Sequence, residues 1–465
     1  MKHYTLQNFD LLKLIAFSLC LMAFTHPVIA EESLADIRAE LDTIRSQYEQ
    51  RIQALEQRLE TAEQQLAEQS VSKAPAPAPP PVPEPTTRES TAGSYTSANN
   101  QYNPAIGIII DGEIWSYGND PAGRSIPGFA FGGESGLADE GLSIGESEFV
   151  FSGNVDNWFY GQITAAIEQE DGEFGIGLEE AFIETLSLPA SITLRLGRFF
   201  SGVGYLNDKH KHTWDFADQA LPYRAFMGSQ YGDDGVQLRW LAPTDFFLEF
   251  GAEIFRGGSY PAGGNANSGF GSTSLFAHTG GDVGFSHSWT AGLSWLGADA
   301  AERESGDEDD PLLFTGSSDI YIADFVWKWA PNGNSRQQNF IFQAEYLWRN
   351  EDGKVLLPGA AISTPLDQDA SGWYVQGTYQ WMPRWRAGLR IDGLSADNPG
   401  MIYTGSILDP QGHDPRRYSL MLDYSNSEFS RLRIQYNRDE TGLESDDQIG
   451  LQYIMSIGAH GSHAF

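Results

Sequence analysis

The stretch "QIGLQYIMSIGAHGSHAF" (448–465) alternates apolar and polar side chains one residue at a time. Its apolar positions are Ile449, Leu451, Tyr453, Met455, Ile457 and Ala459, and the positions between them hold mainly Gln448, Gly450, Gln452, Ser456 and His460. A period of two places each set on its own face of a β-strand. The sequence therefore predicts a strand with one apolar and one polar face near the end of the chain.

The same alternation recurs at 372–381 and at 385–392. Alternating segments of about ten residues match a tilted strand that crosses a lipid bilayer, whereas strands of soluble sandwiches are usually about five or six residues long. We place the strands at 105–115, 142–155, 158–168, 175–186, 190–199, 234–241, 246–256, 272–280, 288–297, 318–329, 339–349, 372–381, 385–394, 416–424, 430–438 and 447–459. We therefore predict an all-β transmembrane barrel of about 16 antiparallel strands over residues 102–465.

The connections between these strands alternate in length. Short ones such as "DN" (156–157) and "MPR" (382–384) alternate with long ones such as 200–233, 298–317 and 350–371. Short turns on one side and long loops on the other are typical of transmembrane barrels. Tryptophans lie near the short turns, where an interfacial aromatic girdle is expected: Trp158, Trp240, Trp289, Trp329, Trp381 and Trp385. Both barrel ends fall on the short-turn side, which we predict to be periplasmic.

Three segments precede the predicted barrel. Residues 1–30 have the charged start, short apolar core and small final residue of a secretory signal peptide. Residues 31–70 carry apolar side chains at steps of three and four, which predicts an α-helical coiled coil, with a single amphipathic helix as the alternative. Residues 71–101 are rich in Pro, Ser and Thr and are expected to form a linker.

Composition excludes several classes of function. A net charge of −34 argues against a nucleic-acid partner, because phosphate binding needs a basic face. The one cysteine, Cys20, lies in the signal segment, so disulfides and thiolate metal sites are not expected in the mature chain. No nucleophile elbow and no HExxH motif is present, so we expect neither an enzyme nor a cofactor.

The chain resembles Gram-negative outer-membrane porins. The resemblance rests on terminal Phe465 after an alternating strand, on "LRLGRFFSGVGYLN" (194–207), and on a coiled coil ahead of the barrel, which resembles the phosphate-selective porin group. It implies a homotrimer in the bacterial outer membrane, in contact with lipid and lipopolysaccharide, with the coiled coil in the periplasm. Similar chains are sometimes labelled TonB-dependent receptors, but the segment before the barrel leaves no plug domain.

The segment "YLNDKHKHTWDFADQALPYR" (205–224) concentrates charge in one long connection. The porin resemblance implies that this loop folds into the barrel and narrows the pore. Lys209 and Lys211 are two of only four lysines after residue 101, so the loop is a candidate for setting ion preference. The candidate constriction residues are Asp208, Lys209, His210, Lys211, His212, Asp215 and Asp218. The plain alternative is a solvated surface loop.

A zinc site is a third hypothesis for this segment. His210 and His212 would share one face of a strand, and Asp208 or Asp215 would complete the ligand set. Other predicted strands place charges on the lumen side: Arg195, Arg239, Arg386, Arg390, Arg417, Arg431, Arg433, Glu249 and Glu253, together with Asp111, Glu113, Asp324, Glu345, Asp392 and Asp423. These charges predict either a field across the pore or ion pairs that merely keep the lumen wet. The acidic segment 298–311 is expected to be a solvated extracellular loop.

The leading hypothesis is thus a porin for passive diffusion of small hydrophilic solutes or ions, filtered by size and charge. A ligand-specific receptor or channel for zinc or an oxyanion such as phosphate is the alternative. A third hypothesis is structural, with the barrel as an anchor for the coiled coil.

Overall fold

The computed structural model describes residues 104–458, apart from 122–123, 133–134, 171–172, 265–268 and 307–310. The predicted signal peptide, coiled coil, linker and terminal Phe465 lie outside the described residues. Within this part of the chain, no helix is both long and apolar enough to cross a lipid bilayer.

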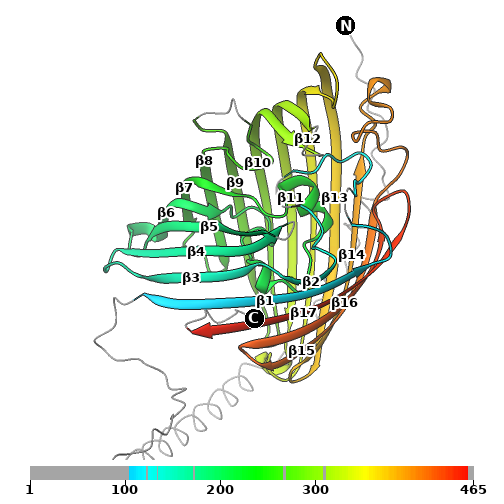
Figure 1. The fold of residues 1–465 in the computed structure, drawn as a ribbon. Coiled ribbons are helices and arrows are strands. Elements are labelled where there is room, and N and C mark those ends of the chain that lie inside the picture. The colour runs from blue at the N-terminus through cyan, green and yellow to red at the C-terminus, as the bar shows by residue number, and fades with distance from the viewer. Residues whose placement is uncertain are drawn as a thin grey trace, which may run out of the picture. The chain divides into compact units, whose positions relative to one another are not determined.

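The described strands form one antiparallel sheet that closes on itself (Figure 1). The strands are β1 (Ala105–Tyr117), β2 (Gly141–Ile144), β3 (Ser147–Asn154), β4 (Phe159–Glu170), β5 (Glu173–Thr185), β6 (Ile192–Phe200), β7 (Gly232–Leu241), β8 (Phe247–Phe255), β9 (Ser272–Val283), β10 (His287–Ser305), β11 (Leu312–Trp329), β12 (Asn339–Leu356), β13 (Thr364–Met382), β14 (Trp385–Ala396), β15 (Arg416–Ser427), β16 (Ser430–Glu440) and β17 (Asp446–Gly458). The helical turns are η1 (Pro189–Ser191), η2 (Lys211–Thr213), α3 (Leu221–Met227), η3 (Pro331–Gly333) and η4 (Met401–Tyr403).

Strand β1 closes the barrel, because it pairs with β17 on one side and with both β2 and β3 on the other. β2 and β3 are two pieces of one barrel strand, interrupted at Gly145 and Glu146. The described strands therefore make a 16-strand antiparallel barrel, as the alternation predicted. All other strands pair with their neighbours in sequence, from β3 with β4 to β16 with β17.

The connections alternate in length as expected. β13 and β14 are joined by residues 383–384, whereas β6 and β7 are joined by residues 201–231. Aromatic rings cluster at the short-turn end, where Trp385 packs against Trp381 and Tyr424 with ring centroids 6.4 and 4.9 Å apart. This cluster lies at a turn where the tryptophan positions predict part of an aromatic girdle.

Two predicted loops are largely strand. β10, β11, β12 and β13 are 18 or 19 residues long and continue through most of 298–317 and 350–371. In the acidic segment the strand pattern persists because Asp299 and Glu304 point outward, while Arg303 points inward and pairs with Glu351 at 2.9 Å. The prediction of a solvated loop over 298–311 is therefore wrong for residues 298–305, because a strand with charges on its outer face has the same composition as a loop.

The outer face of the barrel is apolar, and the inner face of β14 to β16 is polar. Along β14 to β16, Leu389, Leu420 and Ile434 are about half exposed on the outer face. Their sequence neighbours Arg390 and Arg433 are almost completely buried on the inner face. This inversion of a soluble protein's pattern fits a barrel whose outer face meets lipid.

We expect Leu389→Arg to destabilise the folded barrel in lipid vesicles by about 2–4 kcal/mol, the cost of arginine on the lipid face near the bilayer midplane. Urea unfolding in vesicles measures this cost, with Leu389→Val as the matched control. An unchanged free energy of unfolding would contradict a lipid-facing position for residue 389.

Candidate functional site: a segment folded into the barrel lumen

Residues 201–231 lie inside the barrel. Near its start the segment hydrogen-bonds to β8, β10 and β12, its middle reaches β1, β3 and β5, and its later part reaches β13 to β16. These strands stand around the whole circumference. The segment therefore crosses the lumen instead of extending from the rim.

Asn207 joins the entry and the exit of this segment. Its side-chain amide donates to the backbone oxygens of Ser201 and Tyr231, each at 2.8 Å. In return the backbone nitrogen of Tyr231 donates to the Asn207 side-chain oxygen at 2.7 Å. Asn207 is completely buried, so these bonds are not exchanged with water, and they fix where the chain leaves the wall.

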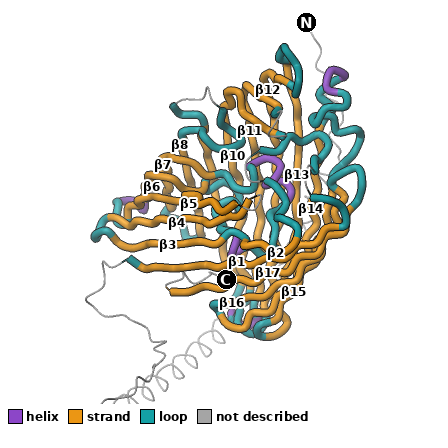
Figure 2. The backbone as a smooth tube through the Cα atoms, viewed as in Figure 1, coloured by secondary structure: helices purple, strands orange, loops and turns teal. Residues whose placement is uncertain are grey.

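One side of the lumen is filled by a hydrophobic core. Helix α3 lies against β12, β13 and β14 (Figure 2). Val203, Leu206, Leu221 and Phe226 of the segment belong to one buried cluster with wall residues Phe255, Leu296, Ile320, Leu347 and Tyr374. Burial of these side chains anchors the segment to the wall formed by β8 and β10–β13. Any route for polar solutes must pass elsewhere.

The acidic residues of the segment contact a basic wall. Asp215 accepts from Arg386 at 2.5 Å, and Asp218 bridges Arg390 and Arg417 at 2.6 and 2.9 Å. The side-chain amides of Gln435 and Asn437 also donate to Asp218, at 2.6 and 3.2 Å. Burial alone would raise the pKa of Asp218, but Arg417 and Arg390 outweigh it and hold this pKa well below its usual range. Asp218 is thus an ionised docking group.

The basic residues of the segment contact an acidic wall. Lys211 pairs with Glu113 at 3.2 Å, and His212 Nδ1 lies 2.6 Å from Glu148. Burial would lower the pKa of Lys211, but Glu113 and Asp111 raise it above its usual value. Acidic side chains of the segment therefore face arginines of the wall, and its basic side chains face carboxylates.

His210 lies among three carboxylates. Its Nε2 is 3.0 Å from Glu180, and its Nδ1 is 3.4 Å from Glu148 and 3.5 Å from Glu179. Burial would lower the pKa of His210, but the charge of Glu148 and interactions with Glu179 and Glu180 raise it well above the usual value.

A β-bulge explains why the adjacent residues Glu179 and Glu180 both reach His210. In the pairing of β4 with β5, Thr164 is opposite Glu180 but Ala165 is opposite Leu178, so Glu179 is the extra residue. A bulge places two consecutive side chains toward the same face. Simple alternation along the strand gives no sign of this carboxylate pair.

The remaining candidate residues of the segment make contacts of their own. Asp208 and Lys209 form an ion pair at 2.8 Å, and both are about half exposed. His210 and His212 lie beside and within η2 rather than on a strand, although their rings stack at 5.8 Å. The prediction that Asp208 or Asp215 completes a metal set with them was wrong, because Asp208 pairs with Lys209 and Asp215 contacts Arg386 on the opposite wall.

The charges predicted on the lumen side mostly form ion pairs along the inner wall. Arg195 and Arg239 both contact Glu184, at 2.8 and 2.9 Å, and Arg239 also approaches Glu249 at 4.0 Å. Asp423 pairs with both Arg433 and Arg386. Two of the predicted charges bind neutral groups of the lumen segment: Glu253 accepts from Ser201 and Gly202, and Arg431 donates to the backbone oxygen of His212. Glu253 also accepts from the wall residues Gln237 and Ser274.

The sequence does not indicate that Glu345 and Arg224 hold the segment. Glu345 accepts from the backbone of Tyr205 and Leu206 and from the hydroxyls of Tyr223 and Tyr374. Arg224 on α3 donates two bonds to the backbone oxygen of Ser135, at 3.0 and 2.8 Å. Alternation indicated that Glu345 faces inward, but its partners come from a loop whose path no periodicity predicts.

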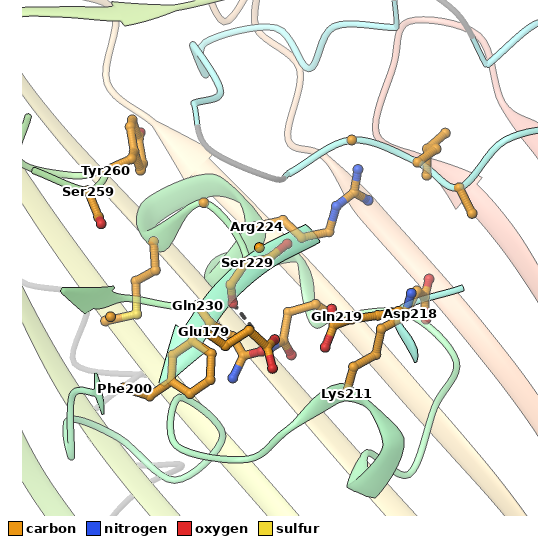
Figure 3. Close-up of a pocket in the computed structure, with 18 of the residues that line it drawn as sticks. Glu179, Phe200, Lys211, Asp218, Gln219, Arg224, Ser229, Gln230, Ser259 and Tyr260 are labelled. Carbon is orange, nitrogen blue, oxygen red and sulfur yellow. Dashed lines mark hydrogen bonds between the residues drawn. The ribbon is translucent and has the colours of Figure 1, made fainter. Parts of the chain in front are cut away.

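A cavity of about 530 Å³ lies beside the segment (Figure 3). Its lining brings together Glu179, Lys211, Asp218 and Arg224, which Figure 3 shows around the same space. Burial and the nearby Arg417 lower the pKa of Arg224 to about 10, so this side chain keeps its charge at neutral pH. The cavity is therefore lined by charges of both signs.

The chain is similar to known proteins in sequence and in fold. It is 29% identical to an uncharacterized protein of Aquifex aeolicus over 359 aligned residues. These residues make up 72% of each of the two chains. No family model matches the sequence. Among solved structures it is similar to the trimer form of OmpT of Vibrio cholerae (10% identity, 76% of this chain and 99% of that chain, TM-score 0.46). It is also similar to the outer membrane channel DcaP of Acinetobacter baumannii (13%, 76% and 97%, TM-score 0.46) and to an anion-selective porin from Comamonas acidovorans (10%, 76% and 99%, TM-score 0.46).

Proposed function

We propose that the protein is an outer-membrane porin for passive diffusion of small hydrophilic solutes or ions. The observation that carries this proposal is a segment docked across the lumen of a closed barrel whose outer face is apolar. A barrel of this size leaves an aqueous channel unless something narrows it. Residues 201–231 are the element that narrows this one, so they set the size limit.

The charge filter in this proposal favours cations. Arg386, Arg390, Arg417 and Arg433 each already contact an aspartate, and Lys211 contacts Glu113. Other lumen carboxylates, such as Asp324, have no ion pair with a basic side chain among the described residues. These five positive charges are thus neutralised locally, and their pairing gives no support to phosphate selectivity. Arg224 and Arg431 donate to backbone oxygens instead. A homotrimer with residues 31–70 as a periplasmic coiled coil completes the proposal.

Single-channel recording in a planar bilayer tests the porin function. We expect discrete conductance steps, and a reversal potential under a salt gradient with the sign of a cation preference. Lys209→Glu is expected to strengthen that preference, because Lys209 is the half-exposed cation of the segment, and Lys354→Glu is the matched control. Absence of channels from correctly folded protein would overturn the proposal and favour a structural anchor.

A further inference from the structure

The cluster around His210 has the geometry of a metal site. The geometry points to a divalent cation site, suited to zinc, formed by Glu148, Glu179 and His210, which come from β3, β5 and the lumen segment. Their candidate ligand atoms all lie within 4.8 Å of one another. Imidazole nitrogen and carboxylate oxygen are ligands that zinc accepts, with one position left for water.

Two of the three spacings between these atoms match a tetrahedron. Zinc lies about 2.0–2.2 Å from nitrogen and oxygen ligands, so neighbouring ligand atoms around it are about 3.4 Å apart. In the structure His210 Nδ1 is 3.4 Å from Glu148 Oε2 and 3.5 Å from Glu179 Oε2. These separations are long for charge-assisted hydrogen bonds, which are about 2.7–2.9 Å.

The surroundings orient His210 for this role. Its Nε2 is 3.0 Å from Glu180, and a proton donated there leaves Nδ1 with the lone pair that a metal needs. Histidines that bind metals commonly donate their other ring nitrogen to a carboxylate in this way. Glu180 is therefore a positioning residue. His212 holds the other oxygen of Glu148 at 2.6 Å and positions that carboxylate in turn.

The excess of carboxylates in the cluster favours binding of a cation. Within the described residues, His210 Nδ1, Glu179 Oε2 and Glu146 Oε1 are buried and have no hydrogen-bond partner. Glu146, Glu148, Glu179 and Glu180 bring four carboxylates together, and Lys211 beside them already pairs with Glu113. One imidazole faces several buried carboxylates, and excess buried charge is costly, so a bound divalent cation would lower that cost while displacing a ring proton from His210. The metal would then tie the segment to β3 and β5.

Metal binding to the folded full-length protein in detergent tests this inference without reference to conductance. After chelator treatment and dialysis against zinc, we expect one zinc per chain by elemental analysis. His210→Gln and Glu179→Gln should abolish stoichiometric binding, and Glu180→Gln should weaken it by about 10- to 100-fold, as loss of an orienting partner does. His278→Gln, a lumen-facing histidine of β9 outside the cluster, should bind as the wild type does.

Two results would overturn the site: no zinc bound by the wild type, or full binding by both His210→Gln and Glu179→Gln. Heat-dependent mobility on a gel separates folded variants from misfolded ones. If a variant is not folded, the wild-type protein is tested instead by adding Co²⁺ and recording its visible absorption spectrum. Tetrahedral coordination by nitrogen and oxygen gives visible bands, so their absence would contradict the site. If the protein binds zinc but forms no channels, only the porin proposal is contradicted. If it forms channels but binds no zinc, only the metal site is contradicted.

Discussion

Replacement of Asp218 by Asn is expected to release the lumen segment from the basic wall. Asp218 bridges Arg390 and Arg417, whose side chains are almost completely buried. Removing the anion that pairs with buried cations costs about 3–5 kcal/mol, and the lower end applies because Asp392 still contacts both arginines, at 3.0 and 3.6 Å. The free energy of unfolding in urea should fall by about 3 kcal/mol.

The same change should alter the channel. Asp218 and Asp215 are the two acidic side chains that hold the segment to β14 and β15, so Asp218→Asn leaves one of these attachments. Current noise and the mean conductance should both rise as the segment moves in the pore. Asp208→Asn is the matched control, because Asp208 is half exposed and contacts only Lys209 among charged groups of the described chain. If Asp218→Asn has the same free energy of unfolding and the same current noise as the wild type, this bridge does not hold the segment.

The contribution of Asp218 depends on pH in a defined direction. Its pKa in the folded protein lies below the value of about 3.9 that an aspartate has when unfolded. A lowered pKa stabilises the fold above the unfolded value, and that stabilisation is lost as the pH falls below about 4. The gap in unfolding free energy between wild type and Asp218→Asn should therefore be constant from pH 7 to pH 5 and shrink below pH 4.

The barrel could be predicted from the sequence because its information is local. Alternation along each strand identifies the lipid face, and the two residues between β13 and β14 show where one strand must turn back. The extensions of β10 to β13 were missed because outward-facing acids beyond the membrane resemble loop composition. At a rim exposed to water, polarity no longer distinguishes a strand from a loop.

The site could be predicted only in part, because it depends on contacts between distant segments. The residue types of 208–218 indicated a charged element, and the resemblance to porins indicated its place in the pore. Which wall each charge meets depends on the path of the loop, as the 2.6 Å contact of His212 with Glu148 shows. The carboxylate pair Glu179–Glu180 arises from a bulge, and a one-residue change of register is not visible in a sequence read by period alone.

Replacement of Glu345 by Gln is expected to loosen the opposite side of the segment. Glu345 is 2% exposed and accepts bonds from the backbone nitrogens of Tyr205 and Leu206, at 3.0 and 3.2 Å. It also accepts from the hydroxyls of Tyr223 and Tyr374, at 2.7 and 2.5 Å. A glutamine of the same shape presents an amide donor where one acceptor stood, so at least one buried donor loses its partner.

The local sequence is adapted to this carboxylate. Gly204 has a φ of 67°, and a side chain there would meet the Tyr223 hydroxyl and lie 2.7 Å from Glu345. The glycine lets the backbone pass close enough for the next two amides to reach the carboxylate. Hydrogen bonds to a charged acceptor contribute about 1.5–3 kcal/mol each, so Glu345→Gln should lower the free energy of unfolding by about 2–3 kcal/mol.

Asp324→Asn is the matched control for Glu345→Gln. Asp324 lies opposite Glu345 in the pairing of β11 with β12, is also buried, and its Oδ2 has no hydrogen-bond partner among the described residues. Loss of charge alone would affect both variants equally, whereas loss of bonds donated to the carboxylate affects only Glu345→Gln. Equal destabilisation in urea would therefore contradict the role of Glu345 as an acceptor for the segment. Because Asp218 and Glu345 hold different parts of the segment on different walls, their separate effects should add in the double variant.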